Sequence, residues 1–160
     1  MRKFSEKNYR PCVGIVLINN GSIFAGQRLD YKSDAWQMPQ GGIEENESPM
    51  RAAIRELKEE TGIKKKHIRI ILESKNWINY DLPKELIPKL WNGKFVGQSQ
   101  KWFAMEFLGS DSDVNINTKN PEFSKWQWMT KNKLLDSIVP FKKRVYENVL
   151  SQFSAQLNLK

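Results

Sequence analysis

The sequence predicts an α+β sandwich built on a mixed β-sheet. Its 160 residues are enough for one domain with a substantial core, and its aromatic content argues against a disordered chain. Several segments have the apolar or alternating pattern of strands, and others have the helical period. Because these segments follow one another without a regular βα alternation, we expect a mixed sheet. One domain is expected over residues 8–155.

A β-hairpin is the first element expected. Residues 12–18 form a continuous apolar run, which is typical of a buried strand. The Asn-Asn-Gly-Ser sequence at 19–22 is a strong turn signal, so residues 22–28 would return as the second strand. Residues 28–35 are polar and predict a loop.

A helix is expected between two clear boundary signals. Ser48 is a favourable N-cap, and Pro49 suits the first helical position because its missing N–H has no helical partner there. Gly62 is typical of the residue that ends a helix in the left-handed conformation. One side of this helix is apolar and would pack on the sheet, with the acidic side facing outward. The apolar side consists of Met50, Ile54, Leu57 and Thr61.

The second half of the chain predicts further strands followed by helices. Pro140 opens the last helix, whose apolar positions repeat at helical spacing from Val145 to Leu157. The other segments are strands at 68–74, 98–108 and 123–129, a short helix at 132–137, and less regular stretches at 76–80, 82–93 and 109–121.

Charge and composition limit the classes of function. The net charge is +8 and the pI about 9.6, yet residues 41–62 carry −3, so the remainder carries +11. An acidic segment in a basic body suits a polyanionic substrate larger than one nucleotide, although solubility alone would also explain the excess. A single cysteine, Cys12, excludes an internal disulfide, and a single histidine, His67, excludes sites with several histidines. No apolar run is long enough for a membrane span, and the N-terminus lacks the apolar core of a signal peptide, so we expect a cytoplasmic protein.

Three glutamates share one face of the first predicted helix. Glu56, Glu59 and Glu60 have the spacing i, i+3, i+4, which places them within a sector of roughly 100°. Like charges at this spacing destabilise a helix by about 0.2–0.5 kcal/mol per pair. A divalent cation would compensate, and carboxylate oxygens are hard ligands suited to Mg²⁺ or Mn²⁺.

The residues around these glutamates resemble the Nudix box, Gly-x5-Glu-x7-Arg-Glu-U-x-Glu-Glu-x-Gly-U, in which U is a bulky apolar residue. A complete match by chance is on the order of one in a billion per starting position. The resemblance implies a Nudix α/β/α sandwich with a central mixed sheet, and hydrolysis of a nucleoside diphosphate linked to another group, with two to three Mg²⁺ or Mn²⁺ ions. The matching positions are Gly41, Glu47, Arg55, Glu56, Leu57, Glu59, Glu60, Gly62 and Ile63.

Further blocks resemble the bacterial RNA pyrophosphohydrolases over nearly the whole chain. They are YRPxVG from residue 9, WQxPQGG from 36, GQxQKWF from 97, PEF from 121 and FKxxVY from 141. This resemblance implies removal of pyrophosphate from the 5′-triphosphate end of RNA, a step that promotes mRNA decay. Dinucleoside polyphosphate hydrolases share many of these blocks, so that activity stays open as the alternative. A non-catalytic nucleotide- or RNA-binding module ranks last, because such modules usually lose box carboxylates. No protein partner is indicated.

The resemblance also assigns roles to individual residues. It implies that Glu56, Glu59 and Glu60 are metal ligands, joined by Glu122 from a loop. Glu56 is the preferred general base and Glu122 the second choice, with Glu60 also counted among the catalytic residues. Arg55 is expected to be structural, since its planar fork can hold a neighbouring box carboxylate.

Substrate contacts are implied on either side of the box. Arg10, Arg28 and Lys142 would meet phosphates or the RNA backbone. Val139 and Phe141 would flank a base, with Phe141 in a loop-like position ahead of the last helix. Gly41 would allow the backbone to approach the acidic face and the substrate closely.

Overall fold

A computed structural model describes residues 8–29 and 35–160 of the protein. Most of the expected elements are present, and residues 30–34 of the expected polar loop lie outside the described ranges. The strands are β1 (Tyr9–Asn19), β2 (Ser22–Arg28), β3 (Trp36–Gln37), β4 (Gln40–Gly42), β5 (Ile68–Glu73), β6 (Ile78–Asp81), β7 (Gly97–Phe107) and β8 (Phe123–Met129). The helices are α1 (Pro49–Thr61), α2 (Lys131–Ser137) and α3 (Pro140–Ser154), with short 3-10 helices η1 (Lys65–His67), η2 (Lys84–Lys89), η3 (Trp91–Gly93) and η4 (Asp111–Asp113).

The sheet is mixed, as the sequence predicts. Its centre is a long parallel pair, β1 with β7, in register from Tyr9 opposite Gly97 to Ile18 opposite Glu106. Every other strand pairing is antiparallel, with β5 and β6 on the far side of β7 and β8 beside β2.

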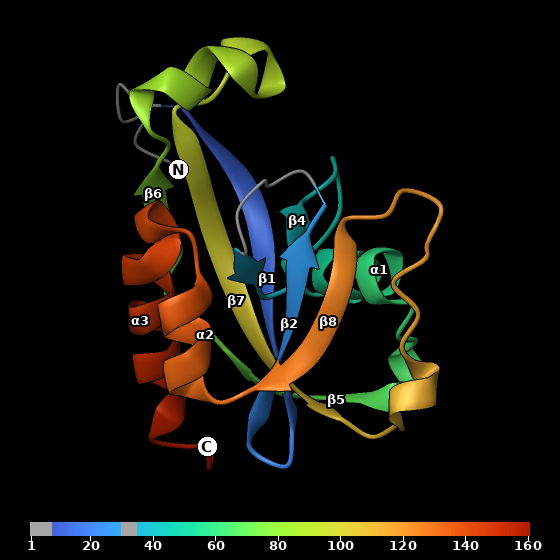
Figure 1. Cartoon of the computed structure of the whole chain (residues 1–160). Coiled ribbons are helices and arrows are strands. Elements are labelled where there is room, and N and C mark those ends of the chain that lie inside the picture. The colour runs from blue at the N-terminus through green and yellow to red at the C-terminus, as the bar shows by residue number, and fades with distance from the viewer. Residues whose placement is uncertain (1–7, 30–34) are drawn as a thin grey trace.

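The two halves of the sheet separate soon after the first hairpin. β2 pairs with β1 only next to the turn, at Ile18–Ile23 and Asn19–Ser22. Beyond that point β4 occupies the place beside β1 and β3 the place beside β2. In Figure 1, β1 and β7 diverge from β2 and β8 away from the hairpin. Residues of β1, β2, β3, β4, β6 and β7 line the space that this opening leaves.

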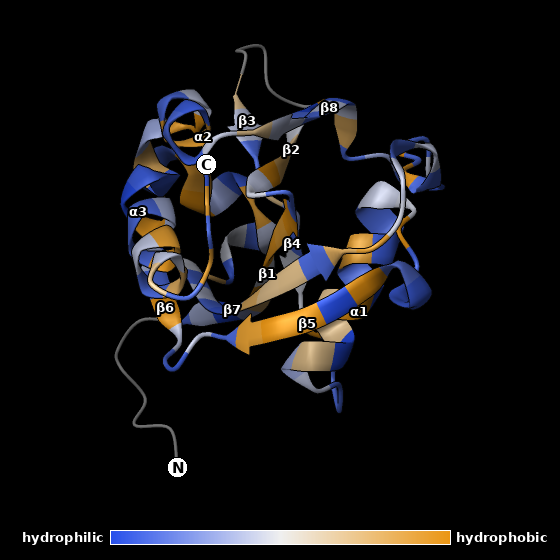
Figure 2. Ribbon diagram, turned by 90° about the horizontal axis from the view of Figure 1, so that it is seen from below, coloured by the Kyte–Doolittle hydropathy of each residue, from blue (hydrophilic) through white to orange (hydrophobic). Residues whose placement is uncertain are grey.

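Helices cover both faces of the sheet. Figure 2 shows α2 and α3 on one side and α1 on the other. Two separate cores result, one under α2 and α3 and one under α1. Successive residues of β7 supply both, since Trp102 belongs to the first and Phe103 to the second. Almost all of β7 is therefore buried, because the helices cover both faces of this central strand.

The ends of α1 were predicted correctly, but its inward face only in part, since Leu57 and Thr61 are buried and Met50 is not. The Ser48 hydroxyl accepts the N–H of Arg51 at 3.2 Å, and Gly62 ends the helix with φ 72°. Met50, expected to face the sheet, is 45% exposed, whereas Glu60, expected to face outward, is only 5% exposed. Small side chains in the middle of the helix bring it close to the core and to β4, which turns Glu60 inward. The buried residues are Ala52, Ala53, Leu57, Glu60 and Thr61.

The last helix packs as its apolar pattern predicts. Its buried side chains include Val145, Tyr146, Val149, Leu150 and Phe153. Among the helices that the structure describes, none is both long and apolar enough to cross a membrane.

Candidate active site

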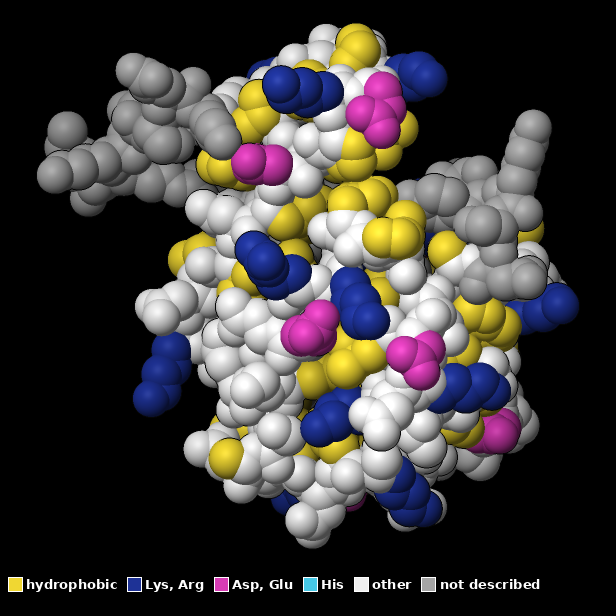
Figure 3. Space-filling view, turned by 60° about the vertical axis from the view of Figure 1, so that its left-hand side comes forward, with side chains coloured by type: hydrophobic (Ala, Val, Ile, Leu, Met, Phe, Trp, Pro, Cys, Tyr) yellow, Lys and Arg dark blue, Asp and Glu magenta, His cyan; other side chains and the backbone are white. Residues whose placement is uncertain are grey.

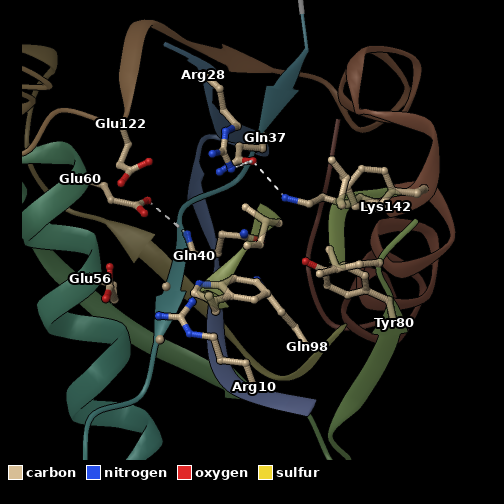
Figure 4. Close-up of a pocket in the computed structure, with 17 residues that line it drawn as sticks. Arg10, Arg28, Gln37, Gln40, Glu56, Glu60, Tyr80, Gln98, Glu122 and Lys142 are labelled. Atoms are coloured by element: carbon tan, nitrogen blue, oxygen red, sulfur yellow. Dashed lines mark hydrogen bonds between the residues drawn. The ribbon is translucent and has the colours of Figure 1, made fainter. Parts of the chain in front are cut away.

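A cavity of about 460 Å³ lies in the opening of the sheet, between α1 and the start of α3. Figure 4 shows three carboxylates on its α1 side and two basic side chains on the opposite side, with Gln40 between them. The lining residues are Arg10, Arg28, Gln37, Gln40, Gly41, Gly42, Glu56, Glu60, Tyr80, Leu82, Leu86, Leu90, Trp91, Gln98, Glu122, Phe141 and Lys142.

The acidic wall concentrates negative charge in a buried setting. The backbone N–H of Gln40 donates to Oε2 of Glu60 at 3.2 Å. Burial raises the pKa of Glu60 well above its usual value, and the charges of Glu56 and Glu122 raise it further. Burial also raises the pKa of Glu56, against a hydrogen bond from Arg55 that lowers it. A bound cation would favour the ionised form of both groups.

The basic wall is held together by one buried amide. Oε1 of Gln37 accepts hydrogen bonds from Nη1 of Arg28 and from Nζ of Lys142, each at 3.3 Å. Gln37 and Lys142 are 3% and 4% exposed. Lys142 is therefore not a surface cation at the mouth of the last helix, since it is buried in the same cavity as the glutamates. Gln37 places two positive groups side by side opposite the carboxylates.

Aromatic and aliphatic side chains form the remaining wall. Phe141 lies in the first turn of α3 rather than in a loop, and its ring centroid is 6.1 Å from that of Tyr80. The guanidinium of Arg10 lies over the ring of Trp91, 4.8 Å from its centroid. Val139, expected to flank a base, packs against the core beneath α3 instead and does not line the cavity. This wall could cover a flat base.

Sequence reasoning missed several residues of this cavity. Tyr80 and Trp91 belong to the less regular segments, where no periodicity marks a functional side chain. Gln37, Gln40 and Gln98 lay within the quoted sequence blocks but received no role. An uncharged amide in a strand carries no chemical signal until its partners are known.

A family model for the NUDIX domain matches residues 8–149. The chain belongs to the Nudix hydrolase family. The protein named RNA pyrophosphohydrolase in Dinoroseobacter shibae is 54% identical over 147 residues, covering 91% of this chain and 92% of that protein. The protein of the same name in Rickettsia canadensis is 51% identical over 160 residues, covering 97% and 98%. The structure of a C. elegans Ap4A hydrolase binary complex resembles the fold, with a TM-score of 0.65 at 20% identity over 91% of this chain and 98% of that one.

Within the Nudix box, Arg55 links the loop before α1 to the glutamates on it. Its Nε and Nη2 each donate to a different oxygen of Glu47 at 2.8 Å. Its Nη1 donates to Glu56 at 2.9 Å and to Glu59 at 3.2 Å, and Nη2 also reaches the carbonyl of Gly42 at 2.8 Å. These bonds lower the pKa of Glu47 to about 2. Arg55 thus stabilises carboxylates that would otherwise repel one another.

Glu47→Gln is expected to lower the melting temperature at pH 7 by about 3–10 °C. The change weakens two hydrogen bonds between charged groups, worth about 1.5–3 kcal/mol, in a protein of this size. Because folding lowers the pKa of Glu47, its stabilisation is complete above the ordinary value of 4.5 and is lost as the pH falls toward 2. Melting curves at pH 7, 5 and 3 should therefore show that the difference in melting temperature between the wild type and Glu47→Gln becomes smaller as the pH falls. Glu45→Gln, in the exposed turn, is the control and should change little.

The glycines of the box let the backbone pass very close to the site. A Cβ at Gly41 would collide with the Glu56 carboxylate, and one at Gly42 would collide with the Arg10 guanidinium. No side chain larger than hydrogen therefore fits at either position while Glu56 and Arg10 keep their places.

Divalent cations are general cofactors of Nudix hydrolases, and this donor set fits one. The carboxylates of Glu56 and Glu60 supply hard oxygen ligands whose buried charge needs compensation. As they stand, the described side chains do not bring three carboxylate, His or Cys groups together around a single point. Arg55 holds Glu56 and Glu59, and Gln40 holds Glu60, so side-chain rotation would accompany binding.

Cys12 lies near the cavity but is no nucleophile. Burial raises the pKa of its thiol to about 11, so it stays protonated at neutral pH. Direct attack by water fits this site better than a covalent intermediate.

Proposed function

We propose that this Nudix hydrolase removes pyrophosphate from the 5′-triphosphate end of RNA and leaves a 5′-monophosphate end, promoting mRNA decay in the cytoplasm. The observation that carries the proposal is the facing of carboxylates and cations across one cavity, with Glu60 on one wall and Lys142 on the other buried. A polyphosphate satisfies both walls, with metal ions between it and the carboxylates and direct contacts to the cations. The names of two relatives more than 50% identical to this chain support RNA as the substrate.

Glu56, Glu59, Glu60 and Glu122 would hold two to three Mg²⁺ ions. When bound, Mg²⁺ would neutralise phosphoryl oxygens and lower the pKa of a water molecule. Glu56 is our preferred proton acceptor for the attacking water, because it is a box glutamate whose side chain lines the cavity. Glu122 is the second choice. Arg28 and Lys142, fixed by Gln37, would bind the phosphate chain.

The phosphorus atom nearest the ribose is the point of attack in this proposal. Water adds an oxygen to that phosphorus, the bond to the bridging oxygen breaks, and inorganic pyrophosphate leaves. The carboxylate that takes the proton of the water returns it to solvent. The products are a 5′-monophosphate end and pyrophosphate.

Hydrolysis of dinucleoside polyphosphates is the second candidate, favoured by one observation. Tyr80, Trp91 and Phe141 form an apolar wall that could hold the base of a small dinucleotide as well as that of RNA. The resembling C. elegans structure is an Ap4A hydrolase, but at its level of identity it supports the fold alone. A binding module without catalysis is disfavoured, because every box carboxylate is present.

A basic groove on the outer side of α1 favours the longer substrate. It is lined by Arg51, Ile54, Arg55, Lys58, Lys64, Lys65 and Lys66, and we call it the α1 basic groove. Because Arg55 also contacts the box glutamates, this groove adjoins the acidic wall. The face over α3 differs, since cations, acids and apolar side chains are interspersed there (Figure 3). A polyanion leaving the cavity would find continuous positive charge only on the α1 side of these two surfaces.

The test compares a triphosphorylated oligonucleotide with diadenosine tetraphosphate. Replacing Lys64, Lys65 and Lys66 by Gln should raise the KM for the oligonucleotide about 5-fold or more at low salt. It should also flatten the salt dependence, whose slope is about −0.7 per phosphate contact with a single strand. Hydrolysis of the dinucleotide, which is too short to reach the groove, should barely change.

Removing three lysines elsewhere, Lys119, Lys133 and Lys160, is the matched control for total charge. Equal effects of the two triple variants would show that net charge, rather than the groove, guides the RNA. A wild-type protein that cleaves the dinucleotide and leaves the oligonucleotide intact would decide for the second candidate.

A further inference from the structure

A chain of side-chain hydrogen bonds runs from the core to the floor of the cavity. Nε1 of Trp102 donates to Oε1 of Gln100 at 3.0 Å. Nε2 of Gln100 donates to Oε1 of Gln98 at 2.8 Å and to Oε1 of Gln40 at 3.3 Å. All four side chains are buried, and Gln40 and Gln98 are the two that line the cavity.

Trp102 sets the direction of this chain. Its indole nitrogen can only donate a hydrogen bond, so the atom that faces it must be the amide oxygen of Gln100. The NH₂ group of Gln100 is then turned toward Gln98 and Gln40, and its two hydrogens serve one amide oxygen each. The orientations of three glutamines follow from a single donor that has no alternative role.

The anchor of the chain is itself rigid. The ring of Trp102 is fully buried and packs edge-on against Tyr146, with centroids 5.7 Å apart. Gly14 lies flat against the same ring, where a Cβ would collide with it. The backbone N–H of Trp102 donates to the hydroxyl of Ser74 at 3.0 Å. The indole cannot turn without displacing the core under α3.

The outer ends of the chain are two NH₂ groups with nothing to bind. Because their oxygens accept from Gln100, Gln40 and Gln98 direct their amide nitrogens away from it. Neither nitrogen makes a hydrogen bond to a residue in the described part of the chain. Neither is among the fully buried atoms that lack a partner, so both keep some exposed surface. Figure 4 shows Gln40 between Glu60 and Lys142, and Gln98 lower in the view near Arg10. The cavity floor therefore presents donors and withholds the amide oxygens.

We propose that Gln100 is a positioning residue, which fixes Gln40 and Gln98 so that their NH₂ groups donate hydrogen bonds to phosphate oxygens of the substrate. The proposal rests on the proposed function, because it assigns part of the same site. Neutral donors suit this place, next to the metal-binding glutamates, because a further cation would compete with the metal. They recognise an anionic oxygen without changing the net charge of the site.

Gln100→Glu tests the proposal, because it reverses the direction of the hydrogen bonds to Gln40 and Gln98 while the side chain keeps nearly the same shape. A carboxylate still accepts from Trp102, but its second oxygen can only accept, so Gln40 and Gln98 turn over and present their oxygens to the cavity. In Mg²⁺, we expect binding of inorganic tripolyphosphate to weaken about 10-fold or more by calorimetry, since charge-assisted bonds are lost. The KM for the triphosphorylated oligonucleotide should rise by a similar factor.

Gln100→Met separates orientation from charge. It removes the hydrogen bonds to Gln40 and Gln98 without adding a carboxylate, so these two amides can turn either way. Binding of tripolyphosphate should therefore weaken only about 3-fold. A loss as large as that of Gln100→Glu would overturn the polarity argument. This variant also keeps the proposal testable if the buried carboxylate of Gln100→Glu prevents folding, because melting curves identify any variant that does not fold.

A double-mutant cycle distinguishes positioning from a structural role. In a background with Gln40→Leu and Gln98→Leu, the donors are absent, so either change at Gln100 should alter tripolyphosphate binding less than 2-fold. The same loss in both backgrounds would mean that Gln100 acts through folding alone.

Titration with adenosine and guanosine examines the other class of acceptor, the base edges. Weakened nucleoside binding with unchanged tripolyphosphate binding would overturn the assignment to phosphate. These titrations need no RNA hydrolysis. A protein without the proposed activity can therefore be distinguished from one in which Gln100 does not position Gln40 and Gln98.

Discussion

Glu60→Gln is expected to abolish most hydrolysis while making the metal-free protein more stable. The amide can still accept the N–H of Gln40, so the fold is kept, but one negative metal ligand is lost. We expect turnover to fall by at least about 100-fold, the scale of removing a principal electrostatic group in a site. Glu59→Gln, at an exposed position on the same helix, should also impair turnover if Glu59 is a ligand.

The difference in stability between Glu60→Gln and the wild type should change with pH in a definite direction. Folding raises the pKa of Glu60, so the folded state binds its proton more tightly than the unfolded state does. In the metal-free protein this group therefore favours folding at low pH, and its contribution is lost as the pH rises from the ordinary value of 4.5 through the raised one. Because Gln does not ionise, Glu60→Gln does not lose this stabilisation as the pH rises. The melting temperature of the variant should therefore exceed that of the wild type by more at higher pH.

Thermal melting with and without Mg²⁺ checks both expectations. Wild-type protein should gain stability on adding Mg²⁺, by the ordinary coupling of binding to folding, and the variant should gain much less. Glu147→Gln, at an exposed position of α3, is the control for removing a negative charge. Normal turnover of Glu60→Gln at saturating Mg²⁺ would exclude Glu60 as a metal ligand.

Glu122→Ala should lower kcat by roughly 10–100-fold with little change in KM or melting temperature. A loss confined to kcat is the pattern of a contact made mainly in the transition state. The Glu122 carboxylate is exposed and makes no hydrogen bond to any described residue, so folding does not depend on it. The contact that its residue does make is the backbone bond from Leu29 to its carbonyl, which alanine preserves.

Measuring kcat, KM and melting temperature on one preparation separates the two roles open to Glu122. A structural role predicts a lower melting temperature with turnover unchanged. Glu122→Gln provides a matched variant, because it keeps the length of the side chain and removes the charge. If the charge is what matters, the Gln and Ala variants should be impaired to a similar degree.

Much of the fold could be predicted because its signals are local. The cap at Ser48, the proline after it and the glycine at 62 fixed the ends of α1 to the residue. The turn at 19–22 likewise predicted the first hairpin. Each of these signals depends on a few neighbouring residues and on backbone preferences that tertiary packing did not override.

The remaining features depend on contacts between distant segments. Nothing near Lys142 in the sequence announces that a glutamine 105 residues earlier holds its amine in a buried site. Met50 has the right helical spacing for the core, yet it lies in the first turn of α1 and is exposed. The separation of β1 from β2, which creates the cavity, follows from the pairing of β4 with β1. The periodicity of a sequence predicts the type of an element, but it does not predict which distant segments that element will contact.

The bond between Gln37 and Lys142 also constrains the order in which the protein can become active during synthesis. The box helix is complete early, whereas the basic wall needs a residue from the last helix, 105 positions after its partner. A ribosome-bound chain that already carries every box glutamate therefore lacks Lys142, one of the two cations opposite them, until α3 has emerged. The long parallel pairing of β1 with β7 imposes the same delay, since distant strands must meet before any contact stabilises them. The nascent chain thus carries its box glutamates well before the cavity is complete.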